Sequence, residues 1–258
     1  MPRFEYKYLA KIDDIDLIRE YTLNFSEPDI HMEKDCLPEY TVRSIYFDTS
    51  KFDLYNDKVE GLEIRKKVRI RGYNQPTGKD IIFLEIKRKW GDAIYKNRAP
   101  ILYENLENLL SLGDVDGLII KNIKGFENSH SDARKFLFHI YRKNMQPTVL
   151  VIYEREAYHS KINGGFRITF DKNLRCFPYP KLNELFVERN LTYYNADYFL
   201  IETKFFGQLP NWFKFLINKF SLMRISFSKY VICLDLIGIA NKRSNFSYAS
   251  GLSKYLGF

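Results

Sequence analysis

The chain has 258 residues, of which 45% are hydrophobic and 16% aromatic, so it can bury a substantial core and is not a disordered polybasic tail. Its formal net charge of +8 favours an anionic partner but leaves nucleic acid, a membrane surface and phosphorylated small molecules open. The length suits one large barrel-type domain or two small ones. Since no repeat, low-complexity tract or linker interrupts the sequence, we predict a single domain over residues 1–258, with 241–258 as a C-terminal tail.

The first part of the chain is predicted to be mostly β-strand. Residues 3–9 are expected to form a strand, followed by an amphipathic helix near 13–24 that Asp13 and Asp14 could cap. Further strands are predicted, in order, at about 40–48, 63–73, 80–90 and 93–101. The sequence Gln-Pro-Thr-Gly at 75–78 is typical of a turn between two of these strands.

The rest of the chain mixes helices with strands. Helices are expected near 103–112 and 131–144, and Pro147 ends the second of them. The remaining elements are predicted as strands at about 148–158, 165–171 and 197–206, a helix after Pro210, and a last helix near 229–239. The fold class is therefore α+β.

Four strands carry charged residues at every second position, and most of these charges are positive. The charged positions are Arg3, Glu5 and Lys7; Lys67, Arg69 and Arg71; Glu85, Lys87 and Lys89; and Glu202 and Lys204. Because successive side chains of a strand face opposite sides, each strand has one apolar and one charged face. A solvated outer face would explain any single strand. The recurrence of Arg and Lys instead favours one shared cationic cavity.

The predicted architecture is an antiparallel β-barrel tunnel that binds a long polyanion inside, with helices packed on the outside. The apolar residues expected beneath those helices are Phe4, Val68, Ile70, Leu84 and Ile201. The cationic side chains and Glu202 are expected to converge on the central cavity.

Cysteine, histidine and hydropathy patterns give no sign of a metal motif or a membrane segment. Cys36, Cys176 and Cys233 are odd in number and far apart, which argues against a disulfide framework and for a reducing compartment. The four histidines, at 31, 130, 139 and 159, form no metal-binding spacing. No signal peptide and no long apolar run appears, so we expect a cytoplasmic protein, which a membrane-bound partner could still hold.

Ten short motifs occur in the order in which they occur in the VTC domain, and together they run from residue 3 to about residue 235. They are RFEYKYL at the start, SIYFDT at 44–49, LYNDKVEG at 54–61, KVRIRGY at 67–73, FLEIKRK at 83–89, IYKNRAPI at 94–101, YEREAY at 153–158, FRITFD at 166–171, IETK at 201–204 and SFSKY at 226–230. The chain therefore resembles this polyphosphate polymerase module of the vacuolar transporter chaperone family, within the triphosphate tunnel metalloenzyme superfamily, in its stand-alone bacterial form.

The resemblance implies an ATP-dependent polyphosphate polymerase whose tunnel binds ATP and the growing polyphosphate. It implies catalytic contacts to phosphate from Arg69, Arg71, Lys87, Arg155, Arg167 and Lys229. The further substrate-binding residues are Lys7, Lys96 and Arg98, which the motifs imply, together with Lys204 and Arg3 on the charged strand faces. Glu202 matches the metal-binding glutamate of the family, and Glu5 and Glu85 are the other candidate ligands of a divalent Mg²⁺ or Mn²⁺ ion.

Two other functions stay open. Hydrolytic tunnel enzymes usually begin with Glu-x-Glu-x-Lys, whereas this chain has Arg3, Glu5 and Lys7, which favours the polymerase. A metal-dependent triphosphatase is still possible if Glu5, Glu85 and Glu202 cluster around two metals. A non-catalytic polyanion-binding module is the third possibility. Nucleic acid is not expected as a partner, because most Tyr and Phe residues alternate toward the apolar side. The oligomeric state is open.

Overall fold

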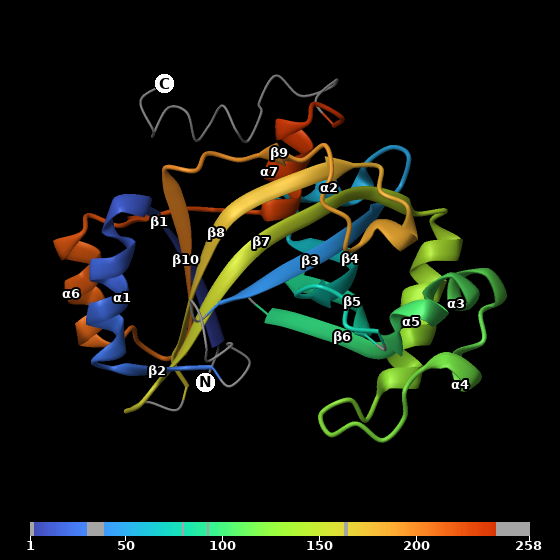
Figure 1. Ribbon diagram of the computed structural model, residues 1–258, viewed down its shortest axis with the longest axis horizontal. Coiled ribbons are helices and arrows are strands. Elements are labelled where there is room, and N and C mark those ends of the chain that lie inside the picture. The colour runs from blue at the N-terminus through green and yellow to red at the C-terminus, as the bar shows by residue number, and fades with distance from the viewer. Residues whose placement is uncertain (1–2, 30–38, 79, 92, 163–164, 241–258) are drawn as a thin grey trace. The chain divides into compact units, whose positions relative to one another are not determined.

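The structure, a computed structural model, describes residues 3–29, 39–78, 80–91, 93–162 and 165–240 (Figure 1). The chain divides into two compact units. Unit 1 is Met1–Thr41, Ile152–Leu174 and Tyr193–Ser228, and unit 2 is Val42–Val151, Arg175–Thr192 and Lys229–Phe258. The predicted single domain over 1–258 stays a prediction. Cys36, His31 and the predicted tail at 241–258 lie outside the described residues.

Unit 1 is an antiparallel sheet with two main helices. Its strands are β1 (Arg3–Lys11), β2 (Ser26–Pro28), β10 (Tyr198–Phe206), β11 (Met223–Arg224) and parts of the long strands β7 (Gln146–Ser160) and β8 (Arg167–Pro178). The hydrogen-bonded order is β11-β1-β10-β8-β7, with β2 paired to β7. The 3-10 turn Ile12–Asp14 leads into α1 (Ile15–Leu23), which lies beside α6 (Asn211–Lys219) (Figure 1).

The core of unit 1 forms where one apolar face of the sheet meets these two helices. Ile201 of β10, Ile18 of α1 and Phe213 of α6 are all fully buried. Phe4 is partly buried and packs against the same cluster. The prediction that Phe4 and Ile201 lie beneath helices is therefore confirmed, because alternation along each strand sends one set of side chains to this face.

Unit 2 contains the other strands of the same antiparallel sheet, with more helices. Its strands are β3 (Tyr40–Asp48), whose first two residues belong to unit 1, β4 (Ile64–Tyr73), β5 (Ile81–Trp90) and β6 (Ala93–Leu102), in the order β7-β3-β4-β5-β6. Its helices are α2 (Asp53–Val59), α3 (Leu106–Leu112), α4 (Val115–Leu118), α5 (Ser129–Arg142) and α7 (Lys229–Leu236), with 3-10 turns at Tyr103–Asn105 and Leu182–Glu184. The short strand β9 (Thr192–Tyr193) pairs with β8.

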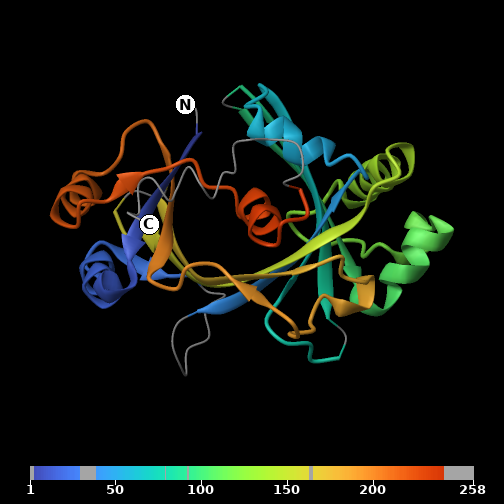
Figure 2. The same ribbon diagram turned by 90° about the horizontal axis from the view of Figure 1, so that it is seen from above.

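The two faces of the unit 2 sheet carry different helices. Figure 2 shows α3, α4 and α5 on one side of β4, β5 and β6, and α7 on the other. Val68, Ile70 and Leu84 are at most 1% exposed, as predicted for residues beneath helices, and Phe136 of α5 packs edge-on against Phe47. The side that carries α7 is the charged side of the same strands.

The Asp48 carboxylate fixes two helices of unit 2 in place. It accepts hydrogen bonds from the backbone N–H groups of Leu54 and Tyr55 in the first turn of α2, and from the Tyr230 hydroxyl of α7. Tyr55 in turn donates to Asp235 of α7. These bonds satisfy N–H groups that a helix start leaves without partners. The motifs SIYFDT, LYNDKVEG and SFSKY therefore meet at a structural contact.

The α+β class and most predicted elements are confirmed, with two corrections. Helix α2 and the short elements α4, β2, β9 and β11 were not predicted. Strand β8 extends to Pro178, beyond the predicted end at 171; Asn173 has a left-handed backbone (φ 50°), which interrupts the alternation from which the strand was predicted. The hydrogen-bonded strand order of the described residues has two ends, β11 and β6, so backbone ladders do not close the sheet.

Candidate functional site

Strand register gathers the predicted cations of unit 2 on one sheet face. Arg69 of β4 pairs with Glu85 of β5, which pairs with Arg98 of β6. Two residues further along each strand, Lys67 of β4 pairs with Lys87 of β5, which pairs with Lys96 of β6. Since directly paired residues of neighbouring strands point to the same side, these side chains share a face. We call it the unit 2 cationic face, and it consists of Lys67, Arg69, Arg71, Lys87, Lys96 and Arg98 around Glu85.

Glu85 is the centre of this face. Its carboxylate is 1% exposed and has Arg69 Nη2 at 2.6 Å, Lys96 Nζ at 2.8 Å and Arg98 Nε at 2.9 Å. Arg71 Nε lies at 4.0 Å. Burial acts to raise the pKa of Glu85, but these four cations outweigh it and hold the pKa well below its usual range. Both oxygens of this candidate metal ligand are thus engaged with protein cations, and its metal role stays a prediction.

Aromatic residues that were not among the predicted site residues hold the arginine side chains in position. Arg69 donates to the Tyr46 hydroxyl at 2.8 Å, and Arg98 donates to the Tyr73 hydroxyl at 3.0 Å. The Arg98 guanidinium also lies 3.6 Å from the centre of the Phe83 ring. Tyr46 and Phe83 could have been found from their alternation with buried apolar neighbours, because their parity puts them on the charged side of β3 and β5.

Electrostatics at this face shift the pKa values of its neighbours. Burial acts to raise the pKa of Tyr46, but Arg69, Arg71 and Lys229 overcome it and lower the pKa. Lys229 itself is 9% exposed and sits at the start of α7, next to Tyr230, which stacks on Tyr46. Helix α7 therefore brings one further predicted cation, Lys229, into the electrostatic surroundings of the unit 2 cationic face.

Lys96 is a cation of this face whose pKa is shifted toward neutral pH. Burial lowers its pKa to about 8, with Glu85 opposing the shift and Arg98 adding to it, although 44% of the side-chain surface stays exposed. A lysine with such a pKa is partly neutral in mildly basic solution. An anion that binds to the protonated amine is therefore expected to bind less tightly as the amine loses its proton.

Glu85→Gln is expected to lower the free energy of unfolding by about 3 kcal/mol, because it leaves several cations facing one another without a counter-charge. Sulfate or inorganic triphosphate should restore more stability to the variant than to the wild type, since an anion can replace the lost carboxylate. Urea unfolding with and without the anion measures both effects. Glu107→Gln, at an exposed glutamate of α3, is the control. An unchanged stability, or an equal response to anions, would contradict this expectation.

Unit 1 places two candidate metal ligands beside two lysines. Lys204 Nζ lies 3.1 Å from Glu202 and 3.9 Å from Glu5, and Lys7 Nζ lies 3.7 Å and 3.6 Å from the same carboxylates. The pairs Lys7–Glu202 and Glu5–Lys204 are directly opposite on β1 and β10. We call these four residues the unit 1 carboxylate–lysine cluster. The sequence prediction that Lys204 shares a face with Glu202 is consistent with this register.

The other predicted residues of unit 1 have different surroundings. Arg155 is buried and makes two hydrogen bonds with Asp171, at 2.6 and 2.7 Å. Arg167, paired with Lys204 across the sheet, donates to Asp29 at 3.1 Å. Arg3 is exposed at the start of β1, with its guanidinium 5.8 Å from the Phe206 ring centre. The roles of these three residues as phosphate ligands stay predictions.

The predicted site residues thus form two groups, one in each unit. That both groups line a single cavity stays a prediction. The described part of the chain contains no group of three or more His, Cys, Asp and Glu residues arranged to hold a metal ion. The paired carboxylates Glu5 and Glu202 still suit a hard divalent cation, because Mg²⁺ is usually held by one or two carboxylates together with substrate phosphates and water.

Comparison with solved structures identifies the fold. A Hippeastrum protein described as a putative adenylyl cyclase with a dominant triphosphatase activity is similar over 91% of this chain and 96% of its own, with a TM-score of 0.50 and 14% sequence identity. The chain has the triphosphate tunnel fold, an α+β fold with a mostly antiparallel sheet, as the strand pattern predicted. At this identity the likeness concerns the fold alone.

Sequence comparison identifies the family. The family model described as VTC domain matches residues 2–237, so the chain belongs to the VTC domain family. Subunit 4 of the vacuolar transporter chaperone complex is 29% identical over 148 residues in Schizosaccharomyces pombe and 25% identical over 153 residues in Trypanosoma brucei. Each match covers 52% of this chain but only about a fifth of the relative, 20% and 19% respectively. Within the described residues, no helix is long and apolar enough to cross a bilayer.

Proposed function

We propose that the protein is an ATP-dependent polyphosphate polymerase that transfers the γ-phosphate of ATP to a growing inorganic polyphosphate chain. The observation that carries the proposal is the unit 2 cationic face, where six cations from three neighbouring strands share one side of the sheet and four of them surround one carboxylate. Strand geometry spaces such side chains about 5 Å apart across the sheet and about 7 Å along it. This regular array suits an anion with repeated charges better than a single phosphate. Membership of the VTC domain family supports the same substrate class.

The proposed chemistry needs positioning and charge stabilisation more than a protein nucleophile. Phosphoryl transfer passes through a loose transition state whose charge is spread over the transferred group. Arg69 and Arg71 would each hold phosphate oxygens through a planar guanidinium, whereas Lys87 and Lys96 would act as point charges. The terminal phosphate of the polymer is already ionised, so no strong general base is required. Tyr46 and Tyr73 would keep the arginine side chains oriented before substrate binds.

The unit 1 carboxylate–lysine cluster would hold the divalent ion. Glu202, with Glu5 beside it, would supply the carboxylate oxygens, and a bound Mg²⁺ or Mn²⁺ would neutralise charge on the β- and γ-phosphates of ATP. Lys7 and Lys204 would then exchange their carboxylate partners for phosphate oxygens. Arg155, Arg167 and Lys229 are proposed as further phosphate ligands, as the family resemblance implies.

Incubating the purified protein with ATP and Mn²⁺ and staining a gel for polyphosphate tests this function. The polymerase requires ADP and acid-labile long-chain phosphate to appear together. Release of free orthophosphate from ATP or triphosphate without polymer would favour a triphosphatase. No turnover, with polyphosphate still bound, would favour a binding module.

The cellular setting follows from the same proposal. We place the protein in the cytoplasm, where ATP is available, and the buried free thiols of Cys176 and Cys233 suit a reducing compartment. A membrane-protein partner that receives the product would fit the chaperone-complex subunits to which the chain is similar.

Binding of inorganic triphosphate is expected to weaken as the pH rises through about 8, the pKa of Lys96 in the free protein. The protonated amine binds the anion, so below this pH the affinity should be level, and above it the affinity should fall by up to about tenfold per pH unit. Calorimetry between pH 6.5 and 9.5 measures the change. Lys96→Arg keeps a permanent charge and should remove most of the decline. Parallel pH curves for the two proteins would show that Lys96 does not contact the ligand.

A further inference from the structure

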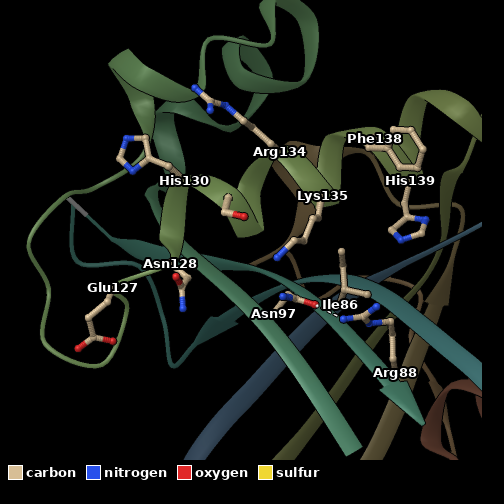
Figure 3. Close-up of a pocket in the computed structure, with 11 residues that line it drawn as sticks. Ile86, Arg88, Asn97, Glu127, Asn128, His130, Arg134, Lys135, Phe138 and His139 are labelled. Carbon is tan, nitrogen blue, oxygen red and sulfur yellow. Dashed lines mark hydrogen bonds between the residues drawn. The ribbon is translucent and has the colours of Figure 1, made fainter. Parts of the chain in front are cut away.

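Unit 2 contains a pocket on the opposite side of its sheet from the unit 2 cationic face (Figure 3). Ile86 and Arg88 of β5 line it, and these positions alternate with Glu85 and Lys87 along the strand. Helix α5 forms the other wall. The pocket has a volume of about 820 Å³, within the range of small-molecule sites. We call it the outer pocket. Neither the family assignment nor the proposed polymerase reaction uses it.

Hydrogen-bond donors from the sheet and from α5 converge in the outer pocket. Figure 3 shows Lys135 and His139 of α5 directed toward Asn97 and Arg88 on the strands. Arg88 is exposed and makes a long hydrogen bond of 3.4 Å to Asn97. A guanidinium, an ammonium, an imidazole and an amide can all donate to the oxygens of one anion.

Asp132 of α5, next to the lining residue Ser131, partly balances these donors, and Glu127 is an acidic residue in the lining itself. Asp132 accepts hydrogen bonds from Asn97 Nδ2 at 2.7 Å and from Lys135 Nζ at 3.3 Å. It also accepts the backbone N–H of Arg98 at 2.9 Å, so it ties α5 to the strand that carries Arg98. Lys135 is half exposed and its ion pair with Asp132 is an i,i+3 pair, which contributes little energy. Lys135 can therefore turn to a bound anion at small cost.

His139 lies in an excess of positive charge. Burial lowers its pKa, and Lys66 of β4, Arg88 of β5, and Arg142 and Lys143 at the end of α5 lower it further. Asp57 of α2 interacts electrostatically with Lys66 and Lys143. The imidazole is consequently neutral near pH 7, although it is surrounded by cations. An anion placed among these groups would reverse the effect and favour the protonated ring.

We propose that the outer pocket is a second anion site, which binds a pyrophosphate group, either free or at the end of a nucleotide. Arg88, Lys135 and His139 hold the phosphate oxygens and Asn97 donates its amide. Phe138, 52% exposed beside His139 on α5, offers a ring on which a nucleotide base could stack. Two linked phosphates suit the pocket better than one, because the donors come from both walls.

NMR of isotopically labelled histidine side chains tests the site directly, with inorganic pyrophosphate and ADP as the probes. The His139 signal is assigned by its loss in His139→Gln. Saturating pyrophosphate is expected to raise the pKa of His139 by about one pH unit in the wild type. A larger rise or tighter binding with ADP would identify a nucleotide as the ligand, and equal behaviour would identify the free anion.

Matched variants on the two sides of the sheet separate this site from the proposed polymerase site. Arg88→Gln and Lys135→Gln, both at exposed positions, are each expected to cut the affinity reported by His139 at least tenfold, whereas Lys96→Gln on the unit 2 cationic face should leave it within twofold. Asp132 stays intact in these tests, because it also holds the backbone of Arg98. The proposal is overturned if pyrophosphate binds without moving His139, if neither probe binds at millimolar concentration, or if only Lys96→Gln removes the response.

Discussion

Glu202→Gln is expected to abolish metal-dependent polymer synthesis and to leave polyphosphate binding largely intact. The substitution keeps the size of the side chain but removes the negative charge that a divalent ion needs, and it leaves every cation in place. The rate of ADP formation with Mn²⁺ measures turnover, and retention of the protein by immobilised polyphosphate measures binding.

Glu5→Gln is the informative comparison for this variant. Glu5 contacts the same two lysines as Glu202, so a purely structural role in the cluster predicts similar, small effects of both changes. A metal role for Glu202 predicts complete loss of turnover in Glu202→Gln. Normal metal-dependent activity in Glu202→Gln would rule out Glu202 as the essential ligand.

Arg69→Ala and Arg71→Ala are each expected to reduce kcat/KM about a hundredfold, or about 3 kcal/mol of transition-state stabilisation, the scale of losing one preorganised donor. Neighbouring positions on one face of β4 allow both guanidinium groups to contact the transferred phosphate. Steady-state ADP formation checks the effect. Lys121→Ala removes an equal charge from an exposed position of the same unit and should change the rate less than twofold.

The alternative for these arginines is a structural role as partners of Glu85, since Arg69 lies 2.6 Å from it. In that case Arg69→Ala should lower stability and leave the rate of the folded protein nearly unchanged. Measuring urea unfolding alongside kinetics separates the two. A kinetic effect below fivefold for both variants would remove them from the catalytic set.

The period-two pattern determined the strands and their charged faces from the sequence alone. Side chains alternate in any strand, so the positions of Lys67, Arg69 and Arg71 relative to Val68 and Ile70 follow from β4 being a strand. The fold class and the apolar faces beneath helices were predictable for the same reason. Helix α2 could not be predicted from its own residues, because its first turn is capped by the carboxylate of Asp48 at the end of the preceding strand.

Tertiary structure decided which charges meet. Glu85 is 16 residues from Arg69 in sequence, and only the register of β4, β5 and β6 places Arg69, Lys96 and Arg98 around its carboxylate. The sequence could not distinguish a metal ligand from the centre of an ion-pair network, because both are carboxylates on a charged face. Similarly, Tyr230 reaches Asp48 from 182 residues away. Alternation is a property of each strand by itself, whereas pairing and helix docking depend on the free energy of the whole packed chain.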